Sequence, residues 1–362
     1  MNETLIPLGQ VAAIGGAVAL GPLWWWRQRS RASSPAQRLR ALTLLTAFLT
    51  FDLIVFGAFT RLTDSGLGCP DWPGCYAAAS PIGAHEPISA AQAAMPTGPV
   101  THSKAWIEMI HRYLASGVGL LILTMTVLSW RLRRQQGAAA PSPWVATWTL
   151  AWVCVQGAFG ALTVTMKLFP AIVTLHLLFG MGLLMLLAWQ AQRFEPRRTP
   201  APAAVRWAVT AVLILTVLQV ALGGWVSTNY AVLACDEFPT CHGGQWWPAL
   251  DFHQGFQFWR ELGQRAGGGF LGFEALAAIH MAHRLGALVV FTAVLGLAWR
   301  LRAGFPGFSR ALMAVAAWQL VSGLSNVVLD WPIVAALAHT AGAAALLSVL
   351  TVLLARLGRR LS

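Results

Sequence analysis

Nine apolar stretches follow one another along the chain, separated by polar or arginine-rich connections. Each is close to or above the length of about 20 residues that an α-helix needs to cross the hydrocarbon core of a bilayer. They predict nine transmembrane helices, at residues 5–26, 41–59, 105–130, 143–166, 170–192, 206–228, 273–299, 309–329 and 332–355. A basic run follows the first stretch and none precedes it, so we expect an uncleaved helix and not a signal peptide.

The composition excludes an ordinary soluble domain. Of the 362 residues, 57% are hydrophobic and only 10% are charged, whereas soluble domains carry far more charge. The formal net charge is +12, but the arginines lie in short clusters between apolar stretches and form no basic stripe of the kind that binds nucleic acid. The predicted fold class is therefore an all-α polytopic membrane protein, in contact with lipid and without a nucleic-acid partner.

The arginine clusters predict the orientation in the membrane. They lie on alternate connections, at residues 27–40, 131–134, 193–198, 300–302 and 356–360. Positively charged residues in short loops mark the cytoplasmic side. We therefore expect the N-terminus to lie outside the cytoplasm and the C-terminus inside it.

Four of the five cysteines form two pairs with the same spacing, Cys69/Cys75 and Cys235/Cys241. Both pairs lie in loops on the side opposite to the arginine clusters. Matching pairs in an oxidising compartment predict two disulfides, whose default role is to stiffen the loops. A redox relay is the alternative, which the absence of a Cys-x-x-Cys spacing makes less favoured. Cys154 lies within an apolar stretch and is expected to be a small core residue.

An internal repeat organises the last eight predicted helices. The matched pairs are Gly57 with Gly223, Cys69 with Cys235, His111 with His283, Gly160 with Gly323, and His176 with His339, at offsets of 166 (235 − 69), 172 (283 − 111) and 163 (339 − 176) residues. We predict two tandem, pseudo-symmetric four-helix bundles of the same orientation. The expected divisions are an extra N-terminal helix with a basic linker at 1–40, an N-terminal half at 41–200 and a C-terminal half at 201–362.

Each predicted half carries two histidines inside its helices. With a rise of about 1.5 Å per residue, His111 and His176 lie about 9 Å below the outer boundary, and His283 and His339 about 15 and 11 Å below it. Two imidazoles at one level of a four-helix bundle are typical of a haem iron with two axial histidines. A single intramembrane histidine is more often a packing residue, but the repeated pair favours two haem sites.

Other metal sites fit the sequence less well. Neither half gathers the three or four nitrogen, sulfur or oxygen ligands of a zinc site. Glu108 and His111 resemble a Glu-x-x-His pair of a di-metal bundle, but the further carboxylates of such a site are missing from the helices.

A carboxylate accompanies only one of the repeated histidines. Glu108 lies one turn before His111, whereas His280 stands at the equivalent position before His283. Electron transfer needs no carboxylate beside a haem, so the asymmetry indicates chemistry in the first half and electron transfer in the second. The alternative is that Glu108 pairs with a nearby Arg or His, as intramembrane charges usually do.

An arginine follows each of these two histidines directly, Arg112 after His111 and Arg284 after His283. Arginine suits bidentate contacts with carboxylates, so both are predicted to bind haem propionates. The alternative is that they extend to the lipid headgroups. The remaining outer-loop histidines, at positions 85, 102, 242 and 253, are expected to be solvated.

Together these motifs resemble the haem A synthase family. The resemblance covers about residues 41–355, and each motif falls in order. It rests on the run from Thr60-Arg61-Leu62-Thr63 to Cys69-Pro70-Asp71-Trp72-Pro73-x-Cys75, on Glu108-x-x-His111-Arg112, on the helix of His176, on the Cys235–Cys241 loop, on His283-Arg284 and on His339. The extra first helix and the long loop at 77–103 depart from the family pattern.

The resemblance implies an oxidase of haem O, which converts the C8 methyl group to a formyl group by successive hydroxylations and loss of water. It implies haem b bound through His283 and His339, haem O bound through His111 and His176, and Glu108 as the catalytic carboxylate. A haem O synthase (protohaem farnesyltransferase) and a membrane electron acceptor are the implied partners, and a bacterial plasma (inner) membrane is the implied location. A quinol-linked b-type dihaem electron carrier and a haem exporter are the alternative functions.

Overall fold

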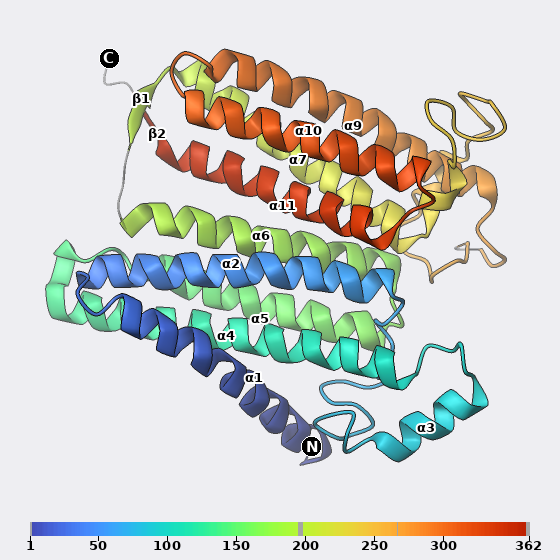
Figure 1. Ribbon diagram of the computed structural model, residues 1–362, viewed down its shortest axis with the longest axis horizontal. Coiled ribbons are helices and arrows are strands. Elements are labelled where there is room, and N and C mark those ends of the chain that lie inside the picture. Colours follow the sequence, from blue (N-terminus) through green and yellow to red (C-terminus); the bar gives the residue numbers. More distant parts are fainter. Residues whose placement is uncertain (1, 195–197, 266, 360–362) are drawn as a thin grey trace. The chain divides into compact units, whose positions relative to one another are not determined.

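The computed structural model describes residues 2–194, 198–265 and 267–359, and these are almost entirely helical (Figure 1). Within these ranges nine helices are long and apolar enough to cross a membrane. They are α1 (Asn2–Arg29), α2 (Pro35–Leu62), α4 (His102–Gln136), α5 (Trp144–Thr165), α6 (Pro170–Phe194), α7 (Ala203–Thr228), α9 (Phe273–Leu301), α10 (Pro306–Val328) and α11 (Ile333–Arg356). The predicted all-α polytopic class is confirmed, and Arg197 and Arg360 of the basic clusters lie outside the described residues.

Several short elements were not predicted. They are the helices α3 (His85–Ala94) and α8 (Phe252–Gly255), the 3-10 turns η1 (Gly137–Ala139) and η2 (Ala231–Ala234), and the strands β1 (Thr199–Ala201) and β2 (Leu357–Arg359). The strands pair in parallel, with Thr199 opposite Leu357. Helix α3 lies in the stretch expected to be a loop, where alanines favour a helix and Glu86 in the first turn complements the helix dipole.

The chain folds as two compact units, each with its own core. The first comprises Met1–Leu168 and Gly182–Arg197, and the second comprises Phe169–Met181 and Arg198–Ser362. This division passes through α6, so that its first half belongs with the second unit. The predicted arrangement as two tandem four-helix bundles stays a prediction.

Within the second unit, α7 packs against α9 and α11, and α10 packs against the same two helices. Their contact is built from aliphatic residues, among them Val209, Val294, Leu312 and Leu350. In the first unit α4 packs against α1, α2 and α5. A hydrophobic core can therefore be traced inside each unit by itself.

The sequence repeat recurs in the backbone. Residues with positive φ angles occur in pairs at the repeat offsets: Asp64 (49°) with Tyr230 (53°), Lys167 (48°) with Asp330 (52°), and Leu168 (58°) with Trp331 (59°). The N–H of Leu168 donates to the carbonyl of Thr163 at 2.8 Å, and the N–H of Trp331 donates to that of Asn326 at 3.0 Å. The same helix-ending turns are thus formed at equivalent places in the two units.

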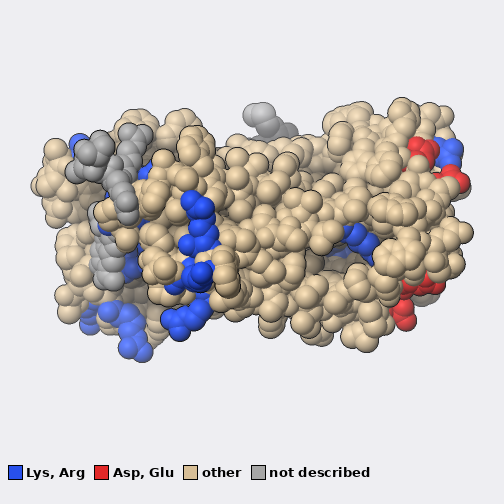
Figure 2. Space-filling model, turned by 90° about the horizontal axis from the view of Figure 1, so that it is seen from above, with Lys and Arg blue, Asp and Glu red and all other residues tan. Residues whose placement is uncertain are grey.

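Charge is distributed unevenly on the visible face of the molecule. Figure 2 shows most Lys and Arg side chains toward one end and Asp and Glu side chains toward the other. In α9, for example, Glu274 lies in the first turn and Arg300 in the last. The predicted membrane orientation, with both cysteine loops outside the cytoplasm, stays a prediction.

Cys154 is not the core residue that was expected. Its side chain is exposed on α5, a helix on which only Ala146, Thr149 and Val164 are buried. An apolar span in a bilayer can direct cysteine toward lipid at little cost, because lipid tails are as apolar as a protein core. Hydropathy alone could not distinguish the lipid-facing side of this helix from the side that faces the protein core.

The extra helix α1 packs closely against α4. A Cβ atom added at Gly15 would meet the backbone carbonyl oxygen of Tyr113 at 2.9 Å and would collide with the Cβ of Ser116. Near the start of α1, Pro7 lies 3.4 Å from the Cβ position of Gly74. The extra helix therefore supports both α4 and the first cysteine loop.

We expect Gly15→Leu to lower the midpoint temperature of thermal unfolding in detergent, because overpacking a close contact costs about 1–3 kcal/mol. Gly9→Leu on the same helix is the matched control, since a Cβ there meets no described atom within 4 Å. An unchanged midpoint for Gly15→Leu would contradict the close packing of α1 on α4.

Candidate functional site

His283 on α9 and His339 on α11 face each other inside the second unit. Their ring centroids are 6.5 Å apart and the ring planes are inclined by 81°. Two imidazole nitrogens that bind one metal ion at about 2 Å each are about 4 Å apart, and each ring centre lies about 1 Å further away, which gives about 6 Å between the centres. The pair therefore has the separation that one iron between two axial histidines requires.

A glycine from a neighbouring helix lies against each of these two rings. A Cβ atom at Gly223 of α7 would be 3.1 Å from Cε1 of His283, and one at Gly323 of α10 would be 3.2 Å from Cε1 of His339. Both glycines belong to the sequence repeat. Because any side chain there would press on the imidazole, the repeat reflects the space that the rings need.

We expect Gly323→Val to displace the His339 ring and to reduce the amount of haem that copurifies with the protein. Gly296→Val is the control, since a Cβ at that position of α9 meets no described atom within 4 Å. The measurement is the ratio of the haem absorbance to the protein absorbance after purification. Equal ratios for the two variants would show that Gly323 is not needed for haem binding.

The outer edge of each ring also has a polar neighbour. Nε2 of the Gln219 amide lies 2.9 Å from Nδ1 of His283, and Oγ of Ser322 lies 3.1 Å from Nδ1 of His339. A metal-binding histidine usually donates its other ring N–H to an acceptor, which fixes the ring and its tautomer. Oγ of Ser322 can accept in this way, whereas the amide nitrogen of Gln219 is a donor. Neither residue was singled out from the sequence, although Gln219 lies one turn before Gly223 and Ser322 lies beside Gly323.

His111 occupies the corresponding place on α4 of the first unit. A Cβ atom at Gly57 of α2 would be 3.0 Å from its Cε1, and the ring of Phe56 is stacked on it with centroids 6.2 Å apart. His176 lies on the part of α6 that belongs to the second unit. The pairing of His111 with His176 therefore stays a prediction.

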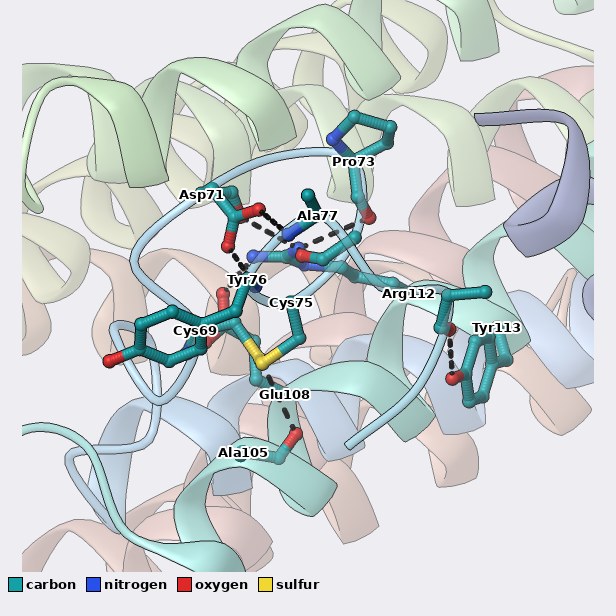
Figure 3. Close-up of a disulfide and its surroundings, with 12 residues drawn as sticks. Cys69, Asp71, Pro73, Cys75, Tyr76, Ala77, Ala105, Glu108, Arg112 and Tyr113 are labelled. Carbon is teal, nitrogen blue, oxygen red and sulfur yellow. Dashed lines mark hydrogen bonds and ion pairs between the residues drawn. A yellow bond between two sulfur atoms is a disulfide. The ribbon is translucent and has the colours of Figure 1, made fainter. Parts of the chain in front are cut away.

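Glu108 and Arg112 join α4 to the first cysteine loop (Figure 3). Oε1 of Glu108 lies 2.5 Å from Nη2 of Arg112, and Oε2 accepts a hydrogen bond of 2.8 Å from the N–H of Cys69. Nη1 of Arg112 donates to the carbonyl oxygens of Asp71 at 3.0 Å and Pro73 at 3.2 Å, and to that of Gly74. Glu108 thus pairs with a nearby arginine, as the alternative predicted, and its role in chemistry stays a prediction.

Arg284 holds the second cysteine loop in the same way. Its Nη2 donates to the carbonyl oxygens of Cys235 at 2.9 Å and Glu237 at 2.8 Å, and its Nη1 donates to that of Thr240 at 2.8 Å. Nε of Arg284 lies 3.3 Å from Nε2 of His280, which stands in place of the carboxylate. Sequence reasoning missed this anchoring role of the two arginines, and their predicted contacts with propionates stay a prediction.

Both predicted disulfides are confirmed. Cys69 is bonded to Cys75 and Cys235 to Cys241, and all four residues are buried. In the first loop the carboxylate of Asp71 accepts hydrogen bonds from the N–H groups of two residues after the disulfide, at 2.6 and 2.7 Å. The loops are therefore fixed by a covalent bond, by an arginine and by backbone contacts.

The outer-loop histidines are mostly solvated, as expected. The side chains at 85, 242 and 253 are exposed, and the hydrogen bond between His242 and Asp236, at 2.9 Å, lowers the pKa of that carboxyl. His102 differs, because it is half-buried at the start of α4 and its Nε2 lies 2.9 Å from Oγ of Ser89.

No group of three or more His, Cys, Asp or Glu side chains that could hold a bare metal ion occurs in the part of the chain that the structure describes. The paired imidazoles of the second unit suit an iron whose other ligands come from a porphyrin. The fold and this site define a class: polytopic helical membrane proteins that carry paired histidines inside their helices.

The family follows from comparison with known proteins. Residues 40–351 match the family model of COX15-CtaA, described as "Cytochrome oxidase assembly protein". A protein of Shewanella oneidensis named "Heme A synthase" is 39% identical over 320 residues, which cover 86% of this chain and 94% of the relative. The chain belongs to the haem A synthase family.

More distant relatives carry the same name. One from Rhizorhabdus wittichii is 27% identical over 355 residues, which cover 89% of this chain and 95% of the relative. Another from Bacillus licheniformis is 24% identical over 257 residues, which cover 68% of this chain and 76% of the relative.

Proposed function

We propose that this protein is a haem A synthase, which oxidises the C8 methyl group of haem O to a formyl group by successive hydroxylations and loss of water. The observation that carries the proposal is the buried Glu108–Arg112 pair, with Oε1 and Nη2 at 2.5 Å, one turn from His111 in a chain of this family. Its counterpart in the second unit is the His280–Arg284 contact. At this position of the repeat, the first unit thus has a carboxylate and the second unit has a histidine.

We propose that His283 and His339 bind a resident haem b. The 6.5 Å between their ring centroids supports this, as do the glycine that lies against each ring and the polar partner at each Nδ1. Such a group, when bound, supplies one-electron transfer. The chain holds both rings in place. The glycine beside each ring leaves the space that a larger side chain would fill.

For the first half of the repeat we propose that His111 and His176 bind haem O as the substrate. Glu108 is the catalytic carboxylate, which accepts a proton or stabilises positive charge that develops at the reacting carbon. The Cys69 N–H and the Arg112 guanidinium fix both oxygens of this carboxylate. A fixed charge needs little reorganisation during the reaction, which is why preorganised groups are effective.

Arg112 and Arg284 are proposed to contact haem propionates. Since both already donate to loop carbonyls, the propionates would share these donors, and each cysteine loop would then be linked to its haem. A haem O synthase (protohaem farnesyltransferase) and a membrane electron acceptor are the proposed partners. The proposed location is a bacterial inner membrane, with both cysteine loops outside the cytoplasm.

The test is expression in a bacterium that makes haem O but lacks its own haem A synthase, followed by haem extraction and mass analysis. We expect haem A in extracts of cells that make this protein and haem O alone in cells with an empty vector. Haem b without any hydroxylated or formylated haem would instead indicate the quinol-linked electron carrier. Cells with the protein that accumulate no modified haem, in the absence of bound haem b, would indicate an exporter.

A further inference from the structure

The two histidines of the second unit are each held by a side chain on a neighbouring helix. Gln219 reaches His283 from α7, and Ser322 reaches His339 from α10. Ser322 is buried, and Gln219 is half-buried. Neither residue is an iron ligand, so their role concerns the imidazoles themselves.

Ser322 determines which nitrogen of His339 carries the proton. Its Oγ–H donates to the carbonyl oxygen of Trp318 at 2.8 Å, so the lone pairs of Oγ face Nδ1 of His339 at 3.1 Å. With Oγ–H directed at that carbonyl, the geometry favours a proton on Nδ1 that Oγ accepts, because a neutral imidazole has one donor and one acceptor nitrogen. The lone pair of Nε2 is thereby left for iron.

Gln219 contacts the same ring nitrogen of His283. Its amide nitrogen lies 2.9 Å from Nδ1 and also donates to the backbone carbonyl of His283 at 2.9 Å. For its buried Oε1, no hydrogen-bond partner occurs among the described residues. The bond to the carbonyl directs the donor side of the amide toward His283. Oε1 can accept from a protonated Nδ1 only after a half-turn about the last bond of the side chain, and this half-turn gives up the bond to the carbonyl.

The repeat places apolar residues at the equivalent positions of the first half. The offset of 166 residues relates Gln219 to Leu53, and the offset of 163 residues relates Ser322 to Phe159. Neither of these side chains can donate or accept a hydrogen bond. The two polar partners are therefore a feature of one half of the repeat.

We propose that Gln219 and Ser322 are positioning residues that strengthen the binding of the resident haem and lower its reduction potential. This inference rests on the proposed haem b site. A hydrogen bond from Nδ1–H makes the imidazole a better electron donor to iron, which favours the ferric state. A haem held in this way stays bound, whereas Leu53 and Phe159 suit a half whose haem arrives as substrate and leaves as product.

The experiment compares purified full-length wild type with Gln219→Met, Gln219→Glu, Ser322→Ala and Ser322→Thr. Two quantities are measured: the reduction potential of the bound haem by spectroelectrochemistry, and the rate of haem transfer to apomyoglobin. We expect Gln219→Met and Ser322→Ala to raise the potential and to weaken haem retention by about 10–100-fold, the usual cost of losing such a partner. Gln219→Glu, which can only accept from Nδ1–H, should lower the potential, and Ser322→Thr should restore wild-type values.

A purely structural role would not give opposite shifts for Gln219→Met and Gln219→Glu. Unchanged potentials and transfer rates in Gln219→Met and Ser322→Ala, beside a wild type with low-spin bis-histidyl haem, would overturn this inference while the haem site stands. A wild type that binds no such haem would instead overturn the proposed function. The spectrum of the wild type thus separates the two failures.

Discussion

Replacement of Glu108 by alanine is expected to abolish the formation of haem A while the spectrum of bound haem b persists. Loss of a group that moves a proton or stabilises charge in the transition state costs about 100-fold or more in rate. The resident haem should be unaffected, because its proposed ligands His283 and His339 lie in the second unit. The measurement is haem extraction with mass analysis beside the reduced-minus-oxidised spectrum of the same preparation.

Two further variants separate catalysis from loop anchoring. Glu108→Gln keeps an acceptor for the Cys69 N–H, which lies 2.8 Å from Oε2, but loses the charge that pairs with Arg112. We expect it to be as inactive as Glu108→Ala if the charge is essential. Arg112→Lys keeps a cation beside Glu108 but cannot reach the several loop carbonyls that the guanidinium contacts, so it should lower the thermal stability of the first unit.

Glu274→Ala is the control for the loss of a carboxylate. Glu274 is an exposed residue in the first turn of α9, and its removal should leave both haem A formation and the haem b spectrum unchanged. Full activity of Glu108→Ala would refute the catalytic role of this carboxylate. Loss of haem b in the same variant would show that the defect lies in folding.

The fold could be predicted from the sequence largely because a bilayer imposes a simple rule. Within a single segment, a helix of about 20 apolar residues satisfies every backbone group in hydrocarbon, so hydropathy locates the helical spans. The short strands at Thr199–Ala201 and Leu357–Arg359 were missed because three residues are too few to show the alternation of polar and apolar residues that predicts a strand. The exposed position of Cys154 was missed because lipid and core are equally apolar.

The candidate site could be predicted in part. The histidines and cysteines could be identified because polar residues that recur in an apolar repeat are conspicuous. Their spacing predicted that the two cysteines and the two imidazoles of the second unit lie close together, and the structure shows both pairs. The loop contacts of Arg112 and the partners Gln219 and Ser322 were not found. These depend on which rotamer each side chain adopts and which loop folds over it, and spacing along a helix specifies neither.

The two halves of the repeat have diverged at the residues around the histidines and not at the histidines themselves. Glu108 is matched by His280, and the apolar Leu53 is matched by Gln219. The arginine, the disulfide and the glycine that lies against the ring are kept in both units. If the proposed function holds, a common framework for holding haem has a carboxylate for chemistry in one copy and hydrogen-bond partners for retention in the other.

Removal of either histidine of the second unit is expected to cost the protein its resident haem. His283→Ala and His339→Ala each take away one of the two rings whose centroids lie 6.5 Å apart. Loss of a ligand should weaken haem retention by more than the about 10–100-fold that loss of an outer partner costs. We therefore expect at least about 100-fold faster haem transfer to apomyoglobin, and a high-spin spectrum from any haem that remains.

His280→Ala and His253→Ala are the matched controls. His280 lies on the same helix as His283, but its ring contacts the carbonyl of Ala231 and the guanidinium of Arg284, so its removal should loosen the second loop without releasing haem. His253 is exposed on α8, and its loss should change nothing. A low-spin haem spectrum in His283→Ala that matches wild type would show that this pair does not bind the iron, because a single remaining imidazole cannot fill both axial positions.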